Sequence, residues 1–190
     1  MKYDKLHLLS ICYSFAIAIL SLSIVFLSNK NNEIFRKLSE PYVLKVVCDD
    51  ISTIFVDGEQ KEAAGTGVWN QLATLVIPAS TKTIGVQCKN TGGPYGIMAT
   101  VEDSTGNVFV VSDNTWKCSN QAQDGWSKSG FVEGASWKPA FYYTGQGAYN
   151  SDTGAWKGMS PNKKVIWTST GDGTAYCRKE LPKPSGYYEL

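Results

Sequence analysis

The stretch "VVCDDISTIFVDGEQ", Val46–Gln60, decides how the sequence is interpreted. Within "STIFVDG" the side chains of Ile54 and Val56 fall on one face, while those of Phe55 and Asp57 fall on the other. An Asp-Gly pair after such an alternation is typical of a tight hairpin turn. The stretch therefore predicts a strand that begins near a cysteine and turns back at Asp57-Gly58.

The same pattern continues to the end of the chain. From Val43 onward, short runs rich in Val, Ile, Thr and aromatic residues alternate with Gly, Asn, Asp and Pro, and no segment has a sustained helical period. We expect strands within "VLKVVC", "STIFVDG", "WNQLATLVIP", "TIGVQCKN", "GIMATVED", "VFVVSD", "WKPAFYY", "KVIWTS" and "TAYCRKEL". The sequence therefore predicts an all-β domain, an antiparallel β-sandwich of the jelly-roll kind.

The N-terminus differs from the rest in composition. No charged residue occurs from Leu8 to Leu27, a stretch just long enough to cross a hydrocarbon core of about 30 Å. Residues 1–28 are therefore expected to form a hydrophobic helix that acts as a signal peptide or as a membrane anchor. Residues 29–40 are interpreted as a linker, residues 41–182 as the β-sandwich and residues 183–190 as a C-terminal tail.

The cysteines outside the apolar segment are Cys48, Cys88, Cys118 and Cys177. They form no CxxC pair and have no histidine near them, which argues against zinc ligation. An even number at wide spacing indicates two disulfides and an oxidising compartment, so the domain is expected to be secreted or displayed at the cell surface. The alternative is four buried free thiols, and the spacing alone leaves all three disulfide pairings open.

Several stretches together resemble the galactose-binding-domain-like β-sandwich, found as accessory modules of glycosidases. They are "CDDISTIFVDG" (Cys48–Gly58), "TIGVQCKNTGGPYG" (Thr83–Gly96), "SDNTW" (Ser112–Trp116) and "VIWTSTGDGTAYCRKEL" (Val165–Leu181). The resemblance covers nearly the whole domain, but members of that family carry apolar residues where this chain has Cys48 and Cys177. Because the first and last strands of that fold are typically neighbours, the resemblance implies the pairs Cys48–Cys177 and Cys88–Cys118.

The composition excludes several kinds of chemistry. The formal net charge is +1 and neither sign forms a long block, so nucleic-acid binding lacks its electrostatic signature. The one histidine, His7, lies outside the domain, which excludes a histidine-based triad and histidine-ligated metal sites. Carboxylates are plentiful, but they lie in or beside turns, and the domain is expected not to be an enzyme.

Calcium is the one metal that the sequence suggests. The resembling family often carries a structural calcium, and Asp49 and Asp50 are the acidic candidates for such a site. Their carboxylates are equally suited to accept hydrogen bonds from turn amides.

The aromatic residues indicate a binding function. Trp167, Phe55 and Trp69 lie in strand patterns and are expected in the core. The resemblance implies that Trp116, in "SDNTW", supports a loop. By contrast, large rings also occur in polar, turn-rich surroundings. The predicted ligand site combines two of these rings with two hydrogen-bonding groups, namely Tyr95 and Trp126 with Asn90 and Asp113. The alternative is that these rings pack over the ends of the sandwich.

Two functions follow as expectations. The first is an extracellular, non-catalytic, lectin-like module that binds a glycan or a glycoprotein through aromatic stacking and a few polar groups. The second is a structural or adhesion subunit, in which the same sandwich buries its aromatic residues against a protein partner in an extracellular or membrane assembly. Membrane attachment would come from the N-terminal segment if it is not cleaved.

Overall fold

The computed structural model describes residues 19–31, 40–63, 65–143, 159–169 and 173–182. Contacts divide the chain into two units, Met1–Ser39 and Glu40–Leu190, which are described separately. The expected C-terminal tail, most of the expected linker and residues 1–18 of the expected N-terminal helix lie outside the described residues.

In the first unit, residues 19–31 form an α-helix. Its large apolar side chains are exposed along its length, including Leu22 and Phe26. No helix among the described residues combines the length and the hydropathy needed to cross a membrane.

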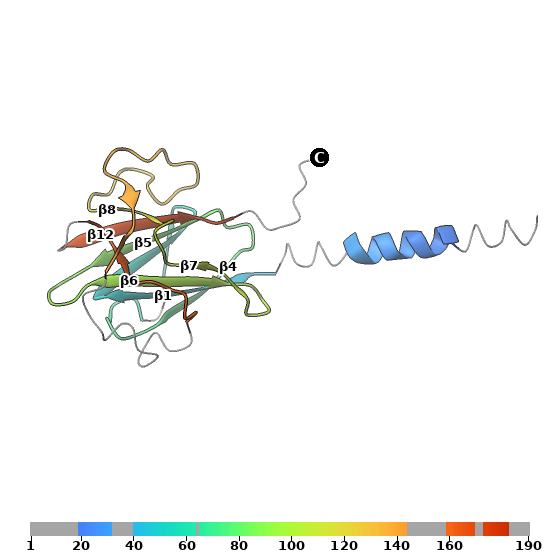
Figure 1. The fold of residues 1–190 in the computed structure, drawn as a ribbon, viewed down its shortest axis with the longest axis horizontal. Coiled ribbons are helices and arrows are strands. Elements are labelled where there is room, and N and C mark those ends of the chain that lie inside the picture. Colours follow the sequence, from blue (N-terminus) through green and yellow to red (C-terminus); the bar gives the residue numbers. More distant parts are fainter. Residues whose placement is uncertain (1–18, 32–39, 64, 144–158, 170–172, 183–190) are drawn as a thin grey trace, which may run out of the picture. The chain divides into compact units, whose positions relative to one another are not determined.

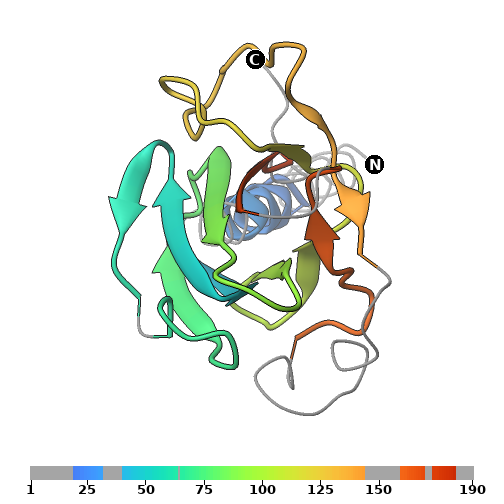
Figure 2. The ribbon, with the colours of Figure 1, turned by 90° about the vertical axis from the view of Figure 1, so that its left-hand side faces the viewer.

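The second unit consists of two antiparallel sheets, as the sequence predicts (Figures 1 and 2). Sheet A has the order β10-β11-β6-β1-β4, with β7 also paired to β6; its strands are β1 (Tyr42–Asp49), β4 (Ala73–Ile77), β6 (Gly96–Glu102), β7 (Val108–Val111), β10 (Phe141–Tyr142) and β11 (Ile166–Trp167). Sheet B has the order β3-β2-β5-β12-β8-β9; its strands are β2 (Ile51–Val56), β3 (Glu59–Lys61), β5 (Thr83–Lys89), β8 (Lys117–Ser119), β9 (Lys138–Pro139) and β12 (Thr174–Glu180).

The hairpin predicted from the opening stretch is confirmed. Strands β2 and β3 pair with Val56 opposite Glu59, and Asp57 and Gly58 between them have φ angles of 50° and 88°. Positive φ at both central residues is what a two-residue hairpin turn requires, and Asp-Gly supplies it at low cost. The Asp57 carboxylate also accepts hydrogen bonds from the Lys82 and Thr83 amides, at 2.9 and 2.8 Å, which fixes the turn against the start of β5.

The core lies between the two sheets and contains alternate residues of both. Fully buried members include Leu44 and Ile97 of sheet A and Ile54 and Val86 of sheet B. The outer face of sheet A carries a second, smaller cluster of Val47, Met98, Met159 and Val165, because the segment around residues 159–165 lies over that part of the sheet.

The structure corrects the disulfide pairing that the resemblance implied. Cys48 is bonded to Cys88, and Cys118 is bonded to Cys177. The reason is topological: β1 lies between β4 and β6 in sheet A, whereas β12 lies between β5 and β8 in sheet B, so the first and last long strands are not neighbours. Cys48–Cys88 therefore joins the two sheets through the core, and Cys118–Cys177 joins directly opposed residues of β8 and β12.

Candidate functional site

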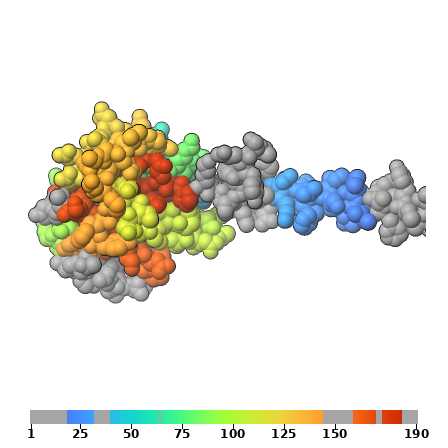
Figure 3. All heavy atoms as spheres, turned by 45° about the horizontal axis from the view of Figure 1, so that its top comes forward, coloured from blue at the N-terminus to red at the C-terminus, as the bar shows by residue number. Residues whose placement is uncertain are grey.

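The predicted ligand residue Trp126 is buried, with 7% of its surface exposed. It belongs to residues 120–137, a segment that packs on the outer face of sheet B through contacts with Gly85 and Arg178. In Figure 3 this segment lies next to β12. The Trp126 ring contacts Phe55 and Tyr176 edge-on, at centroid distances of 5.2 and 5.5 Å, and stacks on Trp137 at 5.8 Å. The expectation that Trp126 is exposed in a polar loop is therefore wrong, because its ring packs with other aromatic rings in a second hydrophobic layer on the outer face of sheet B.

A glycine in the sheet makes room for this ring. A Cβ atom placed on Gly85 would lie 2.9 Å from Cη2 and Cζ3 of Trp126 and 2.8 Å from Cβ of Ser127. Gly85 stands in the middle of β5, directly between Phe55 of β2 and Arg178 of β12. Glycine inside a strand often marks such a close approach of another group.

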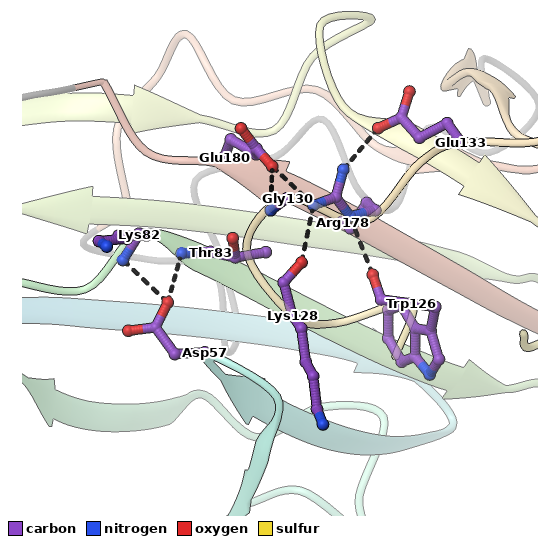
Figure 4. Close-up of polar contacts among 9 residues, drawn as sticks. All are labelled: Asp57, Lys82, Thr83, Trp126, Lys128, Gly130, Glu133, Arg178 and Glu180. Atoms are coloured by element: carbon purple, nitrogen blue, oxygen red, sulfur yellow. Dashed lines mark hydrogen bonds and ion pairs between the residues drawn. The ribbon is translucent and has the colours of Figure 1, made fainter. Parts of the chain in front are cut away.

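Arg178 holds the 120–137 segment in place (Figure 4). Its side chain is 3% exposed and donates hydrogen bonds from Nε to the Trp126 carbonyl, at 2.9 Å, and from Nη2 to the Lys128 carbonyl, at 3.1 Å. It also forms ion pairs with Glu133, at 2.6 Å, and Glu180, at 2.9 Å. A buried guanidinium needs such a full set of acceptors, so this network is best explained as structural support.

Glu180 extends the network to the next turn of the segment. Its Oε1 accepts a hydrogen bond from the Gly130 amide at 3.3 Å, in addition to the contact with Arg178 (Figure 4). The hydrogen bond from Arg178 lowers the pKa of Glu180 below its ordinary value; partial burial opposes this, and the Gly130 amide and the charge of Arg178 assist it. The carboxylate form therefore stabilises the covering segment.

Asn90 and Tyr95 lie together in the turn between β5 and β6. The Asn90 amide donates to the Gly173 carbonyl at 2.8 Å, and its Oδ1 accepts from the Gly92 amide at 3.2 Å. Tyr95 is half-buried and packs against Tyr143 and Trp167, at centroid distances of 4.3 and 5.1 Å. Both side chains therefore have clear structural uses at this end of the sandwich.

Asp113 braces a different turn, between β7 and β8. Its Oδ1 accepts a hydrogen bond from the Thr115 amide at 2.8 Å and another from the Thr115 hydroxyl. Among the described residues, the Tyr95 ring packs on Tyr143 and Trp167 beside β11, whereas the Trp126 ring packs on the outer face of sheet B. The structure thus places the four predicted ligand residues on three separate segments.

The calcium candidates are largely committed to other contacts. Asp49 is buried, and Oδ2 of Asp50 accepts hydrogen bonds from the amide and hydroxyl of Thr91, at 2.7 and 2.5 Å. Burial acts to raise the pKa of Asp50, but hydrogen bonds with Asp49 and Thr91 outweigh it and lower that pKa. Calcium takes six to eight oxygen ligands, and the described residues contain no group of three or more acidic or other metal-ligating side chains. Structural calcium at Asp49 and Asp50 therefore remains a prediction.

The structure confirms the expected burial of some other aromatic residues and contradicts it for others. Trp167 is fully buried in the core, and Trp116 is fully buried with its Nε1 donating to the Val111 carbonyl at 2.9 Å. Trp69, expected in the core, is 49% exposed, because β4 begins only at Ala73. Phe55 is half-buried on the outer face of sheet B instead of lying in the core.

A mixed aromatic and polar surface remains beside the covering segment. Thr53, Gln87 and Tyr176 occupy directly opposed positions on β2, β5 and β12, and Phe55 follows Thr53 on the same face. All four side chains are half-buried. We name these four residues the Tyr176 face. It offers two aromatic rings next to a hydroxyl and an amide, a combination that can contact apolar surface and form directed hydrogen bonds.

Sequence reasoning missed this face for an identifiable reason. Phe55 and Tyr176 lie in strand patterns, from which Phe55 is expected in the core and Tyr176 has no predicted role. The alternation along β2 contained the signal, because Ile54 and Val56 face inward and Phe55 must then face outward.

Comparison with known proteins does not add to this geometry. No protein-family model, no curated protein and no solved structure matches the chain.

Proposed function

We propose that the domain is a non-catalytic, lectin-like module that binds a glycan or a glycoprotein through the Tyr176 face. The observation that supports this proposal is the grouping of Tyr176 and Phe55 with Gln87 and Thr53 on one face of sheet B. Sugars present apolar C–H patches between hydroxyl groups, and a half-exposed aromatic ring beside an amide and a hydroxyl complements both features.

The proposal also includes the place where the domain acts, which is outside the cell. Two disulfides within one small domain are compatible with an oxidising, extracellular environment. The N-terminal apolar segment would deliver the domain there, as a signal peptide or as an uncleaved anchor. The jelly-roll strand order and the relation to galactose-binding-domain-like modules are likewise parts of the proposal, and they are supported by the two-sheet antiparallel architecture.

The test is a glycan array probed with the full chain in its oxidised form. A double variant, Thr53→Ala with Gln87→Ala, removes the polar groups and leaves both rings in place. A matched control, Gln71→Ala, removes the same amide from an exposed position in the turn before β4. Loss of one or two hydrogen bonds should weaken binding about tenfold or more.

Saturable binding by the wild type and by Gln71→Ala, with a tenfold loss in the double variant, would support the proposal. Binding that the double variant retains would move the site away from the Tyr176 face. A wild type that binds no glycan would remove the lectin-like function itself. Circular dichroism should be unchanged in all three proteins, so that a loss of binding reflects the missing polar groups and not unfolding.

A further inference from the structure

Strand β4 ends the strand order of sheet A and pairs on one side with β1. Among the described residues, no strand pairs with its other side. The turn at Gly65 approaches the beginning of β4, because a Cβ placed on Gly65 would lie 3.1 Å from the Leu72 carbonyl oxygen and 3.3 Å from the Ala73 nitrogen. The open part of the edge therefore begins at Thr74 and extends to Ile77.

This edge lacks the features that usually protect an edge strand. Proteins block such edges with charged residues, proline, bulges or very short strands. Strand β3 carries Glu59 and Lys61, and β9 and β10 have two residues each. Strand β4, with the sequence ATLVI, has neither a charge nor a proline, and it pairs with β1 without a bulge.

The surface around the edge is also apolar. Val76 is 67% exposed on the outer face of the sheet, where it lies opposite the half-buried Val43. The turn before β4 exposes Val68 and Trp69. The nearest charges on this face of the sheet, those of Lys45 and Glu102, neutralise each other in an ion pair of 2.6 Å.

We infer that β4 is a dimerisation edge, on which a second copy of this chain adds its own β4 in antiparallel orientation to extend sheet A. A two-fold pairing centred on Leu75 places Thr74 opposite Val76 of the second copy, and Ala73 opposite its Ile77. The Thr74–Val76 pairs combine two β-branched residues, the Ala73–Ile77 pairs combine a small with a large residue, and the central pair is Leu75 with Leu75, so that apolar or β-branched side chains meet at every position. An uncharged strand meets no like-charge repulsion from its own copy, and two-fold dimers are the commonest oligomers.

The first test measures the mass of the full chain, in mild detergent, by light scattering over a hundredfold range of concentration. Val76→Lys places a charge on the edge at a position where the side chain already faces solvent. The matched control is Val132→Lys, since Val132 is 87% exposed on the segment that covers sheet B. The wild type and Val132→Lys should form dimers, and Val76→Lys should raise the dissociation constant at least tenfold.

A second test is specific to the register and does not depend on other contacts between copies. Chains with Thr74→Cys and chains with Val76→Cys are mixed and oxidised mildly. A disulfide should form between unlike variants, because cysteines at directly opposed positions have Cβ atoms about 5 Å apart. Monomeric wild type, or a mixture without this cross-link, would overturn the proposal, as would a dimer equally weakened by both lysine variants.

Discussion

The close approach of Trp126 to Gly85 can be tested by adding a single methyl group. In Gly85→Ala the new Cβ would lie 2.9 Å from two ring carbons of Trp126 and 2.8 Å from Cβ of Ser127, distances that real Cβ atoms essentially never show. Overpacking of this kind typically costs about 1–3 kcal/mol. Gly67→Ala is the matched control, because a Cβ there meets nothing within 4 Å.

The assay is urea unfolding of the full chain, monitored by far-UV circular dichroism. The slope of the free energy of unfolding against urea concentration must be the same in all variants. Gly85→Ala should lower the free energy of unfolding by about 1–3 kcal/mol relative to Gly67→Ala. A double variant, Gly85→Ala with Trp126→Phe, replaces the indole by a smaller ring and so relieves the contact with the new Cβ. The double variant should then be more stable than the sum of the two single effects, by roughly 1 kcal/mol. Equal midpoints for the two alanine variants would refute the claim that the ring rests on Gly85.

Three further predictions test the framework. Peptide mapping should recover Cys118 joined to Cys177, and Cys118→Ser with Cys177→Ser should reduce the free energy of unfolding by up to about 4 kcal/mol, the chain-entropy value for a loop of 59 residues. Arg178→Met should cost about 1–3 kcal/mol or more, measured by urea unfolding, since it leaves the buried Trp126 carbonyl without its donor and removes a second hydrogen bond to the Lys128 carbonyl. Because the folded pKa of Glu180 is lowered, its contribution to stability is present above the unfolded value near 4.5 and is lost as the pH falls through the folded pKa. The stability advantage of the wild type over Glu180→Gln, measured between pH 7 and pH 3, should therefore shrink on acidification, and an advantage constant with pH would contradict this.

The parts of the fold that depend on neighbouring residues could be predicted. The hairpin at Asp57-Gly58 is set by alternation and by two positive φ angles, both of which are properties of a few adjacent residues. Strand β8 was not predicted, because its three residues are too few to show a period. It is stabilised by pairing with β12, which is a contact between distant parts of the chain.

The disulfide pairing could not be obtained in the same way. It depends on which sheet each strand joins, and a strand's own sequence does not record its neighbours. Cys48 and Cys88 both face the core from opposite sheets, and Cys118 and Cys177 face each other within one sheet. A resemblance that made the first and last strands neighbours therefore paired the wrong partners.

The expectation that Trp126 is exposed failed for a more instructive reason. Trp126 lies among polar residues, so a rule based on local composition places it at the surface, whereas the outer face of sheet B provides a partner surface that this rule ignores. Gly85, inside strand β5, was the sequence signal for a group packed onto that face. Once Trp126 fills the space above Gly85, Phe55 and Tyr176 are left beside it half-covered, next to Thr53 and Gln87. The residue expected to bind ligand therefore supports the residues that we now propose to bind it, and Gly85→Ala should impair glycan binding together with stability.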